Sequence, residues 1–381
     1  MSDLRMKRIA YSSLAVCILN LSLLLPATAA TEWTITESLG LDALAFIGVL
    51  SGDRMAEEIY QSEADDFRSR MSEAGLTALN ALDDKIRVEL KSLVGPVLAA
   101  YYSTGPTDTL DDLLATVEDP ERVRSVFLVS PSDNVHWGIF HDTLPEVRIV
   151  VEELRRVGFE EYWKKEVLPK IDERKPFFVD AVQEYDIIPE QERLLGHDLE
   201  PTIHIVVLNY NKPYGISING QRFITHYSWE AGIQLRTATH ELFHSPFDSD
   251  DRELRSLLEP LASDKWMQNI VNDHDPKFGY NSFLDDGIVQ EDSAKALDQI
   301  VSKRLGFARD PAKRFAESDG GMHMLAAALY HAMMEDGFAE NGGAYGDWLK
   351  SALRRGLLRP QEVRRRAAEV VGQEAVDKWD Y

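Results

Sequence analysis

The sequence predicts a predominantly helical α+β protein, on the basis of three observations. Most of the 381 residues belong to stretches with apolar side chains at three- and four-residue spacing, which is typical of helices. After residue 200 the pattern changes to a β-branched stretch followed by a hairpin pattern. After Gly232 it returns to the helical spacing. We therefore expect many helices and one small sheet, antiparallel or mixed.

The composition limits the classes of function. The chain has 64 acidic and 41 basic side chains, a formal net charge of −23, and 44% hydrophobic residues. Binding to the phosphate backbone of nucleic acids requires Lys and Arg, so nucleic acid is not an expected partner. The hydrophobic content excludes a disordered chain and allows a sizeable core.

The N-terminal segment has the features of an export signal. Three basic residues, Arg5, Lys7 and Arg8, precede an apolar run over residues 14–25 that is too short to span a bilayer, and small residues follow it. An uncleaved anchor is the alternative, because the run can be extended backward. We expect a secreted or periplasmic protein whose only membrane contact is this signal, if it stays uncleaved.

The first elements after the signal are helices. Periodicity predicts helices over residues 53–74, 76–102 and 145–184. Chain breakers predict turns at Gly75, Gly105 to Pro106, Pro120 and residues 130–134. This part therefore forms an N-terminal helical region.

The next elements form the sheet. Residues 202–208 are β-branched and strand-like. Residues 215–218 and 221–225 flank Asn219 and Gly220, a dipeptide that favours a two-residue hairpin turn. We therefore expect three short strands, two of them paired as a hairpin.

Helices are predicted again for the rest of the chain, over residues 233–244, 251–269, 287–305, 321–335, 347–355 and 360–379. These patterns divide the chain into a signal peptide (1–30), an N-terminal helical region (31–198), a catalytic core (199–345) and C-terminal helices (346–381). Cleavage of the signal would remove Cys17, the only cysteine, so the mature chain would contain no disulfide.

The chemistry is concentrated in the five residues from His240 to His244. Two histidines four apart on a helix project from one face, so both imidazoles can reach one zinc ion. Glu241, between them, can then lie beside a metal-bound water and act as its general base. The pattern therefore predicts a hydrolytic metal site.

This motif resembles that of the zincin metallopeptidases, and the resemblance extends over about residues 200–335. The metzincin branch continues with glycine and histidine three and six residues after the second histidine, where this chain has Phe247 and Asp250. A variant with aspartate at the sixth position would make Asp250 the third ligand. However, the chain lacks the glycine that allows the required turn.

The gluzincin branch takes its third ligand from a glutamate on a later helix, and Glu291 opens such a helix. The resemblance thus implies Glu291 as the third ligand. Where that family often has an aspartate four residues later, this chain has Lys295. Asp298, on the same face as Glu291, could instead accept the second ring N–H of His240 or His244.

Peptide hydrolysis also needs a donor for the oxyanion that develops on the carbonyl. Tyr280 and His323 are the candidates, and the sequence does not choose between them. The family resemblance implies that substrate adds as a strand to the sheet edge near residues 216–224.

The sequence therefore predicts a zinc-dependent metallopeptidase that cleaves a peptide or protein substrate outside the cytoplasm. His240, His244 and Glu291 would bind Zn²⁺, and Glu241 would be the general base. The alternative is an exported, non-catalytic binding or scaffold protein on a zincin-like fold. Glu241 argues against it, because a purely structural zinc site needs no general base.

Overall fold

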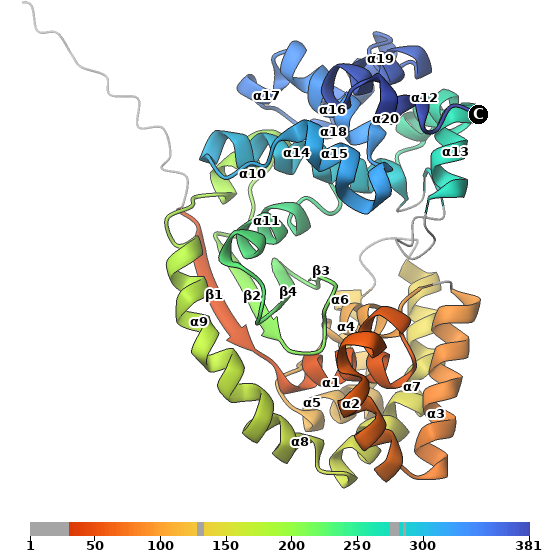
Figure 1. Cartoon of the computed structure of the whole chain (residues 1–381), viewed down its shortest axis with the longest axis vertical. Coiled ribbons are helices and arrows are strands. Elements are labelled where there is room, and N and C mark those ends of the chain that lie inside the picture. The colour runs from red at the N-terminus through yellow and green to blue at the C-terminus, as the bar shows by residue number, and fades with distance from the viewer. Residues whose placement is uncertain (1–29, 91, 128–132, 275–281, 285–286) are drawn as a thin grey trace, which may run out of the picture.

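The computed structural model describes residues 30–90, 92–127, 133–274, 282–284 and 287–381 (Figure 1). The protein is mostly helical and has one four-stranded mixed sheet, which confirms the α+β class. The predicted signal peptide lies outside the described residues except for Ala30. Within the described part of the chain, no helix is long and apolar enough to cross a membrane.

The strands are β1 (Glu32–Glu37), β2 (Thr202–Leu208), β3 (Ile216–Ile218) and β4 (Arg222–His226). The helices before β2 are α1 (Leu39–Leu50), α2 (Arg54–Arg70), α3 (Glu73–Asp83), α4 (Val94–Tyr102), α5 (Leu110–Glu118), α6 (Arg124–Phe127), α7 (Asp133–Arg156), α8 (Phe159–Tyr162), α9 (Leu168–Val182) and α10 (Ile188–Leu195). The helices after β4 are α11 (Ala231–Glu241), α12 (Arg252–Ala262), α13 (Lys265–Asp273), α14 (Ile288–Leu305), α15 (Pro311–Glu317), α16 (Met324–Glu335), α17 (Phe338–Asn341), α18 (Tyr345–Arg354), α19 (Pro360–Val371) and α20 (Gln373–Asp377).

The sheet has the strand order β1-β2-β4-β3. β1, β2 and β4 run parallel, and β3 is an antiparallel edge strand that pairs with β4. The predicted hairpin is confirmed, but its loop has three residues, 219–221, and not the two expected. Gly220 in this loop has a φ of 81°, which glycine adopts without strain. The strand β1 was not predicted. It comes from the N-terminal helical region but pairs with β2, Trp33 facing Ile203, so the sheet joins both parts of the chain.

The sheet and α11 occupy the middle of the molecule (Figure 1). α1 to α8 lie in its lower part and α12 to α20 in its upper part, while α9 runs along β1. α11 packs on β4 on one side and on α14 on the other. The end of α11 is therefore held between the sheet and the upper helices.

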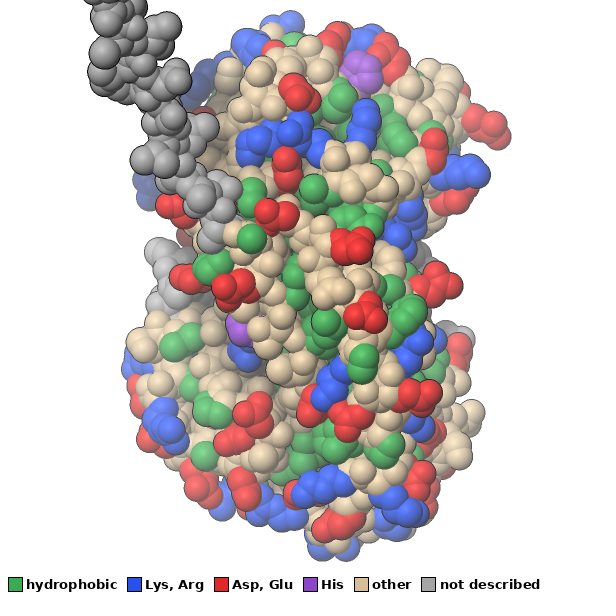
Figure 2. Space-filling view, turned by 90° about the vertical axis from the view of Figure 1, so that its left-hand side faces the viewer, with side chains coloured by type: hydrophobic (Ala, Val, Ile, Leu, Met, Phe, Trp, Pro, Cys, Tyr) green, Lys and Arg blue, Asp and Glu red, His purple; other side chains and the backbone are tan. Residues whose placement is uncertain are grey.

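Charged side chains of both signs are interspersed on the face shown in Figure 2. Many are paired across the molecule, as Arg304 is with Glu190 at 2.7 Å. Exposed pairs of this kind contribute little stability individually. On this face the acidic excess of the chain is distributed and forms no single binding patch.

Several predicted boundaries in the N-terminal region are wrong. The predicted helix 76–102 is divided, since α3 ends at Asp83 and α4 begins at Val94, and the predicted helix 145–184 is divided between α7 and α9. The turn expected at Gly75 falls at Ser72, whose side chain accepts a hydrogen bond from the Gly75 N–H and caps α3. The helix expected to begin at Pro145 begins at Asp133, passes through Pro145 and ends before Gly158. Gly158 has a φ of 78°, a left-handed conformation that ends helices.

Three later boundaries also differ. The predicted helix 251–269 is divided at Asp264, whose carboxylate caps α13 by accepting from the Trp266 and Met267 N–H groups. The predicted helix 360–379 is divided at Gly372, where φ is 87°. α11 ends at Glu241, three residues earlier than expected.

Candidate metal centre

α11 is fixed along its length by buried polar contacts as well as by apolar packing. Gln234 is fully buried and its side chain bonds to Thr225 on β4. The Thr239 carbonyl accepts from the Gln191 side chain at 3.0 Å. After Glu241 the chain continues in a tighter turn, in which the His244 N–H donates to the Glu241 carbonyl at 3.2 Å. His244 therefore lies about one turn beyond His240 and next to it, although His244 is outside α11.

The structure brings together the three ligands predicted from the sequence. One ligand atom each of His240, His244 and Glu291 lie within 4.8 Å of one another. The two Nε2 atoms are 3.2 Å apart, and each is 3.4 Å from a Glu291 oxygen. Ligand atoms of a tetrahedral zinc ion, about 2.0–2.1 Å from the metal, are about 3.3 Å apart. The two 3.4 Å distances involve different Glu291 oxygens, Oε1 for His240 and Oε2 for His244, so the three side chains lie close enough together to hold one metal ion.

Asp298 orients the first of these imidazoles, as the sequence predicts. Its carboxylate accepts from His240 Nδ1 at 2.9 Å, which leaves Nε2 directed at Glu291. Arg314 is also buried and donates through both terminal nitrogens to Asp298, one of them at 2.6 Å. Metal-binding histidines usually have such a carboxylate on their second nitrogen. The sequence did not indicate Arg314, because nothing in its spacing relates α15 to α14.

Lys295 lies where the family pattern has an acidic residue, and the structure shows what it contacts. Its ammonium group is 3.0 Å from Glu291 Oε1 and 3.4 Å from Asp319 Oδ2. Asp319 also accepts from His323 Nε2 at 2.6 Å. Lys295 therefore holds one oxygen of Glu291 in place and connects it to a second, partly exposed carboxylate.

The charges around the ligands leave a negative excess. The groups in contact with one another are the carboxylates of Glu291, Asp292, Asp298 and Asp319 and the cations of Lys295 and Arg314. With neutral imidazoles, four negative charges face two positive ones. A divalent cation between the ligands would balance this excess, so the charge as well as the spacing suits a metal.

The titration of His240 agrees with a site that lacks positive charge. Burial lowers the pKa of His240, but the facing Glu291 carboxylate and the hydrogen bond to Asp298 outweigh it and raise that pKa to about 10. Burial raises the pKa of the Glu291 carboxyl, but Lys295 and His240 hold it well below its usual range. A proton on His240 thus occupies the position that a metal would take.

Glu241 lies between the ligands and the edge strand. Its Oε2 accepts a hydrogen bond from the Ser217 N–H of β3 at 2.7 Å, and its side chain is buried. Burial raises the pKa of Glu241, while the neighbouring His240 and His244 act in the opposite direction. A carboxylate held beside two imidazoles and a strand edge can exchange a proton with a group bound between them.

The remaining candidates do not join this group. Asp250 is exposed and does not belong to the group of described residues that could hold a metal ion. His323 cannot donate to a substrate oxyanion, because it is fully buried and both ring nitrogens contact carboxylates, those of Asp292 and Asp319, at 2.6 Å. Tyr280 lies outside the described residues.

Comparisons with known proteins identify no relative of this chain. No protein-family model matches the chain, and no curated protein and no solved structure is significantly similar to it.

Proposed function

We propose that this protein is a zinc-dependent metallopeptidase with a zincin-like core of the gluzincin type. The observation that carries the proposal is the close grouping of the His240, His244 and Glu291 ligand atoms, within 4.8 Å of one another, with Glu241 beside them. The proposed core consists of the mixed sheet, α11 and α14. Its edge strand β3 contacts Glu241 directly.

The donor set favours zinc over harder cations. Two imidazoles and one carboxylate are the ligands of many catalytic zinc ions, whereas Mg²⁺ and Ca²⁺ prefer oxygen ligands. Three protein ligands leave a fourth position for water or substrate. A zinc ion held by these three ligands would lower the pKa of a water in the fourth position to near neutrality and would polarise the carbonyl of the peptide bond.

The protein side chains supply the rest of the chemistry. Glu241 would take a proton from the attacking water and deliver it to the leaving amine. β3 pairs with β4 on one side, so an extended peptide can add to its other side. The Ser217 N–H donates to Glu241 there, and a peptide that pairs with Ser217 would take over this hydrogen bond. Such pairing would place the peptide backbone next to Glu241. The export signal predicted for the N-terminus would locate this activity outside the cytoplasm.

Metal content and peptide cleavage test the proposal together. The wild-type chain should bind about one zinc ion and cleave an unstructured protein such as casein. Glu241→Gln should keep the zinc and lose cleavage, while Glu291→Gln should lower zinc affinity about 100-fold or more. Glu317→Gln, an exposed site with the same change of charge, is the control and should alter neither property.

A different result would favour the second candidate, an exported binding or scaffold protein. Lys295 favours this second candidate, because an ammonium group in contact with Glu291 would repel a metal cation bound to the same carboxylate. Zinc binding by wild type without cleavage of any unstructured protein would support this candidate. Failure of the wild-type chain to bind zinc would remove the metallopeptidase proposal altogether.

A further inference from the structure

An open groove lies between α12 and the turn that connects α18 to α19, in the upper part of the molecule (Figure 1). Its volume is about 880 Å³, which is in the range of ligand-binding clefts. The residues that α12 contributes are about one turn apart and share one face of that helix. From Ser256 to Leu261 they rise by about 7.5 Å, the length of two or three residues of an extended chain. The groove can therefore hold a short peptide segment.

Both walls of this groove are partly apolar. Leu257 on α12 and Leu353 on α18 line it and are half-buried. Pro260 and Pro360 also line it and are accessible to solvent. Covering apolar surface is favourable because it removes that surface from water. The groove therefore suits a ligand with at least one apolar side chain.

Pro260 leaves a backbone acceptor without its usual donor. Proline has no N–H, so Pro260 cannot donate to the carbonyl of Ser256, one turn earlier in α12. Ser256 is exposed and lines the groove. A ligand with an N–H group, such as the backbone of a peptide, can supply the donor.

The charge of the lining is opposite to that of the whole chain. Three arginines, Arg354, Arg359 and Arg364, line the groove, while Asp264 is the one carboxylate among the described lining residues. Two of the arginines already contact carboxylates of described residues, those of Glu253, Asp264 and Asp380. The contacts of Arg364 are long, at 3.2 and 3.4 Å. The groove thus retains an excess of positive charge.

Arg359 is the arginine that stays available to a ligand. Its guanidinium lies against Gly356, where φ is 77° and a Cβ would be only 2.6 Å from Arg359 Nε. Among the described residues, none accepts a hydrogen bond from this guanidinium or forms an ion pair with it. A guanidinium has five N–H donors in a planar fork that matches the two oxygens of a carboxylate.

We propose that this groove is a docking site for a short acidic peptide segment, in which carboxylate side chains flank an apolar one. The carboxylates would bind Arg359 and the neighbouring arginines. The apolar side chain would cover Leu257 and Leu353, and a backbone N–H would donate to the Ser256 carbonyl. The described lining residues include none of the proposed metal ligands, so the site does not depend on the peptidase function.

The net charge of −23 does not prevent such binding. At physiological ionic strength, exposed charges are screened beyond about 8 Å, so the arginines of the groove dominate over distant carboxylates. A long polyanion such as a nucleic acid would extend past the groove onto a chain with a large acidic excess. The charge distribution therefore favours a short acidic segment of a protein.

Fluorescence anisotropy with two labelled peptides tests this proposal. One peptide has the core Glu-Leu-Glu-Glu and the other has Gln-Leu-Gln-Gln, which keeps the apolar side chain but removes the charges. Both are measured on the full chain with Glu241→Gln, so that cleavage cannot remove them. At about 0.1 M salt the acidic peptide should bind about tenfold more tightly than the neutral one. Higher salt should reduce this difference, because it screens exposed charges.

Two further variants locate the binding site. Arg359→Gln should weaken binding of the acidic peptide about five- to tenfold, because a charge-assisted hydrogen bond is lost. Arg252→Gln is the matched control and should leave the affinity unchanged, since Arg252 is an exposed arginine of α12 outside the described lining. Ser256→Trp fills the groove from an exposed position and should weaken binding about tenfold or more. Urea unfolding verifies that each variant is folded.

Equal affinity for the two peptides, or equal losses in Arg359→Gln and Arg252→Gln, would overturn the proposal. Dimerisation in analytical ultracentrifugation that Ser256→Trp abolishes would identify a second copy of the chain as the occupant and would overturn it too. The same holds if a single-stranded oligonucleotide binds as tightly as the acidic peptide. None of these measurements uses cleavage, so their outcome is distinct from that of the peptidase tests.

Discussion

α1 and α14 are both buried helices, but their polar content differs greatly. All twelve residues of α1 are buried, and Asp42 is the only charged one. The buried residues of α14 include Gln290, Glu291, Asp292, Ser293, Asp298, Gln299 and Ser302. A helix that is apolar on all sides can be buried without hydrogen-bond partners for its side chains, whereas each buried polar side chain requires a partner.

The partners of the buried carboxylates show what each helix does. Asp42 accepts from the Trp163 indole at 2.7 Å and from the Asn209 and Tyr210 N–H groups at 2.9 and 2.8 Å, all neutral donors that tie α1 to neighbouring elements. Asp298 on α14 instead contacts a cation and an imidazole. We infer that Asp42 of α1 serves the fold and that Asp298 of α14 serves the candidate metal site.

The largest effect expected from this comparison is on stability in α1. Phe46 is fully buried, and its ring packs against those of Phe67, Phe159 and Tyr210. Phe46→Ala should lower the free energy of unfolding by about 3–5 kcal/mol, measured with urea at fixed zinc concentration, and leave zinc affinity unchanged. Ile59→Ala, at a 45% exposed site, is the control and should change stability by less than about 0.5 kcal/mol. Similar losses for both variants would contradict the assignment of α1 to the core.

A smaller effect should appear in the pH dependence of stability. Burial raises the pKa of Asp42 to about 6, despite its hydrogen bonds to Trp163, Tyr210 and Asn209. The folded state therefore holds this proton more tightly than the unfolded state, so stability should fall as the pH rises from about 4 through 6, by up to about 3 kcal/mol. Unfolding of the wild type and of Asp42→Asn across this range measures the effect. The variant should lack this component, and parallel curves for the two proteins would refute it.

The smallest effect expected concerns α14 and the metal. Asp298→Asn should lower zinc affinity about 10- to 100-fold in competition with a chromophoric chelator, because the charge that orients His240 is lost. Asp42→Asn makes the same change on α1 and should leave zinc affinity as in wild type. If both variants lose zinc affinity equally, or neither does, the division of roles between the two helices is wrong.

The sequence predicted much of the candidate site because most of its residues lie close together in the sequence or at helical spacing from one another. His240 and His244 are one turn apart, and Glu291 and Asp298 share a face of one helix. The hairpin of β3 and β4 was predicted from the dipeptide Asn219–Gly220, although its loop is one residue longer than the two-residue turn expected. Lys295 was identified only as a departure from a family pattern, and its contacts with Glu291 and Asp319 depend on how α14 meets the residues before α16. For His323 the sequence suggested a role in binding the oxyanion, whereas the structure places its ring between two carboxylates. These partners could not be predicted from the neighbouring methionines.

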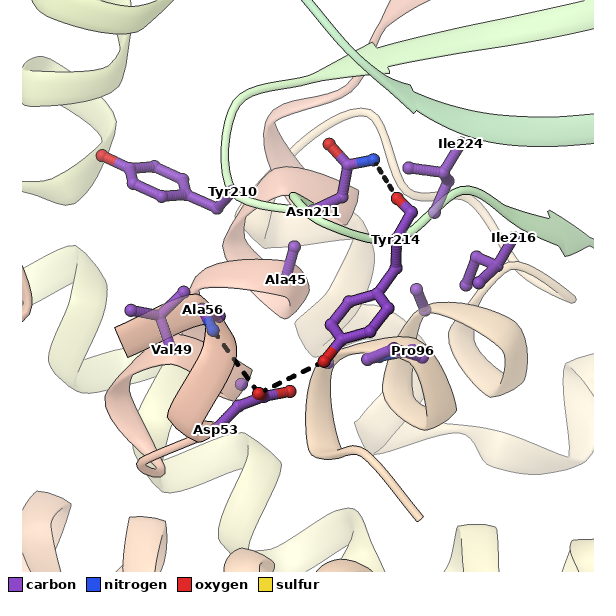
Figure 3. Close-up of a pocket in the computed structure, with 13 residues that line it drawn as sticks. Ala45, Val49, Asp53, Ala56, Pro96, Tyr210, Asn211, Tyr214, Ile216 and Ile224 are labelled. Carbon is purple, nitrogen blue, oxygen red and sulfur yellow. Dashed lines mark hydrogen bonds between the residues drawn. The ribbon is translucent and has the colours of Figure 1, made fainter. Parts of the chain in front are cut away.

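Local patterns in the sequence determined the helices, the hairpin and the two-histidine motif, because these depend on residues within a few positions of each other. Tertiary structure alone decided the contacts between distant segments. β1 pairs with β2 across about 170 positions, Arg314 reaches Asp298, and Glu241 meets the Ser217 N–H. The same holds for the narrow cavity drawn in Figure 3, whose walls come from α1, α4, the loop from β2 to β3 and the sheet. The physical reason is that such contacts are set by the packing of whole elements, which no short stretch of sequence encodes.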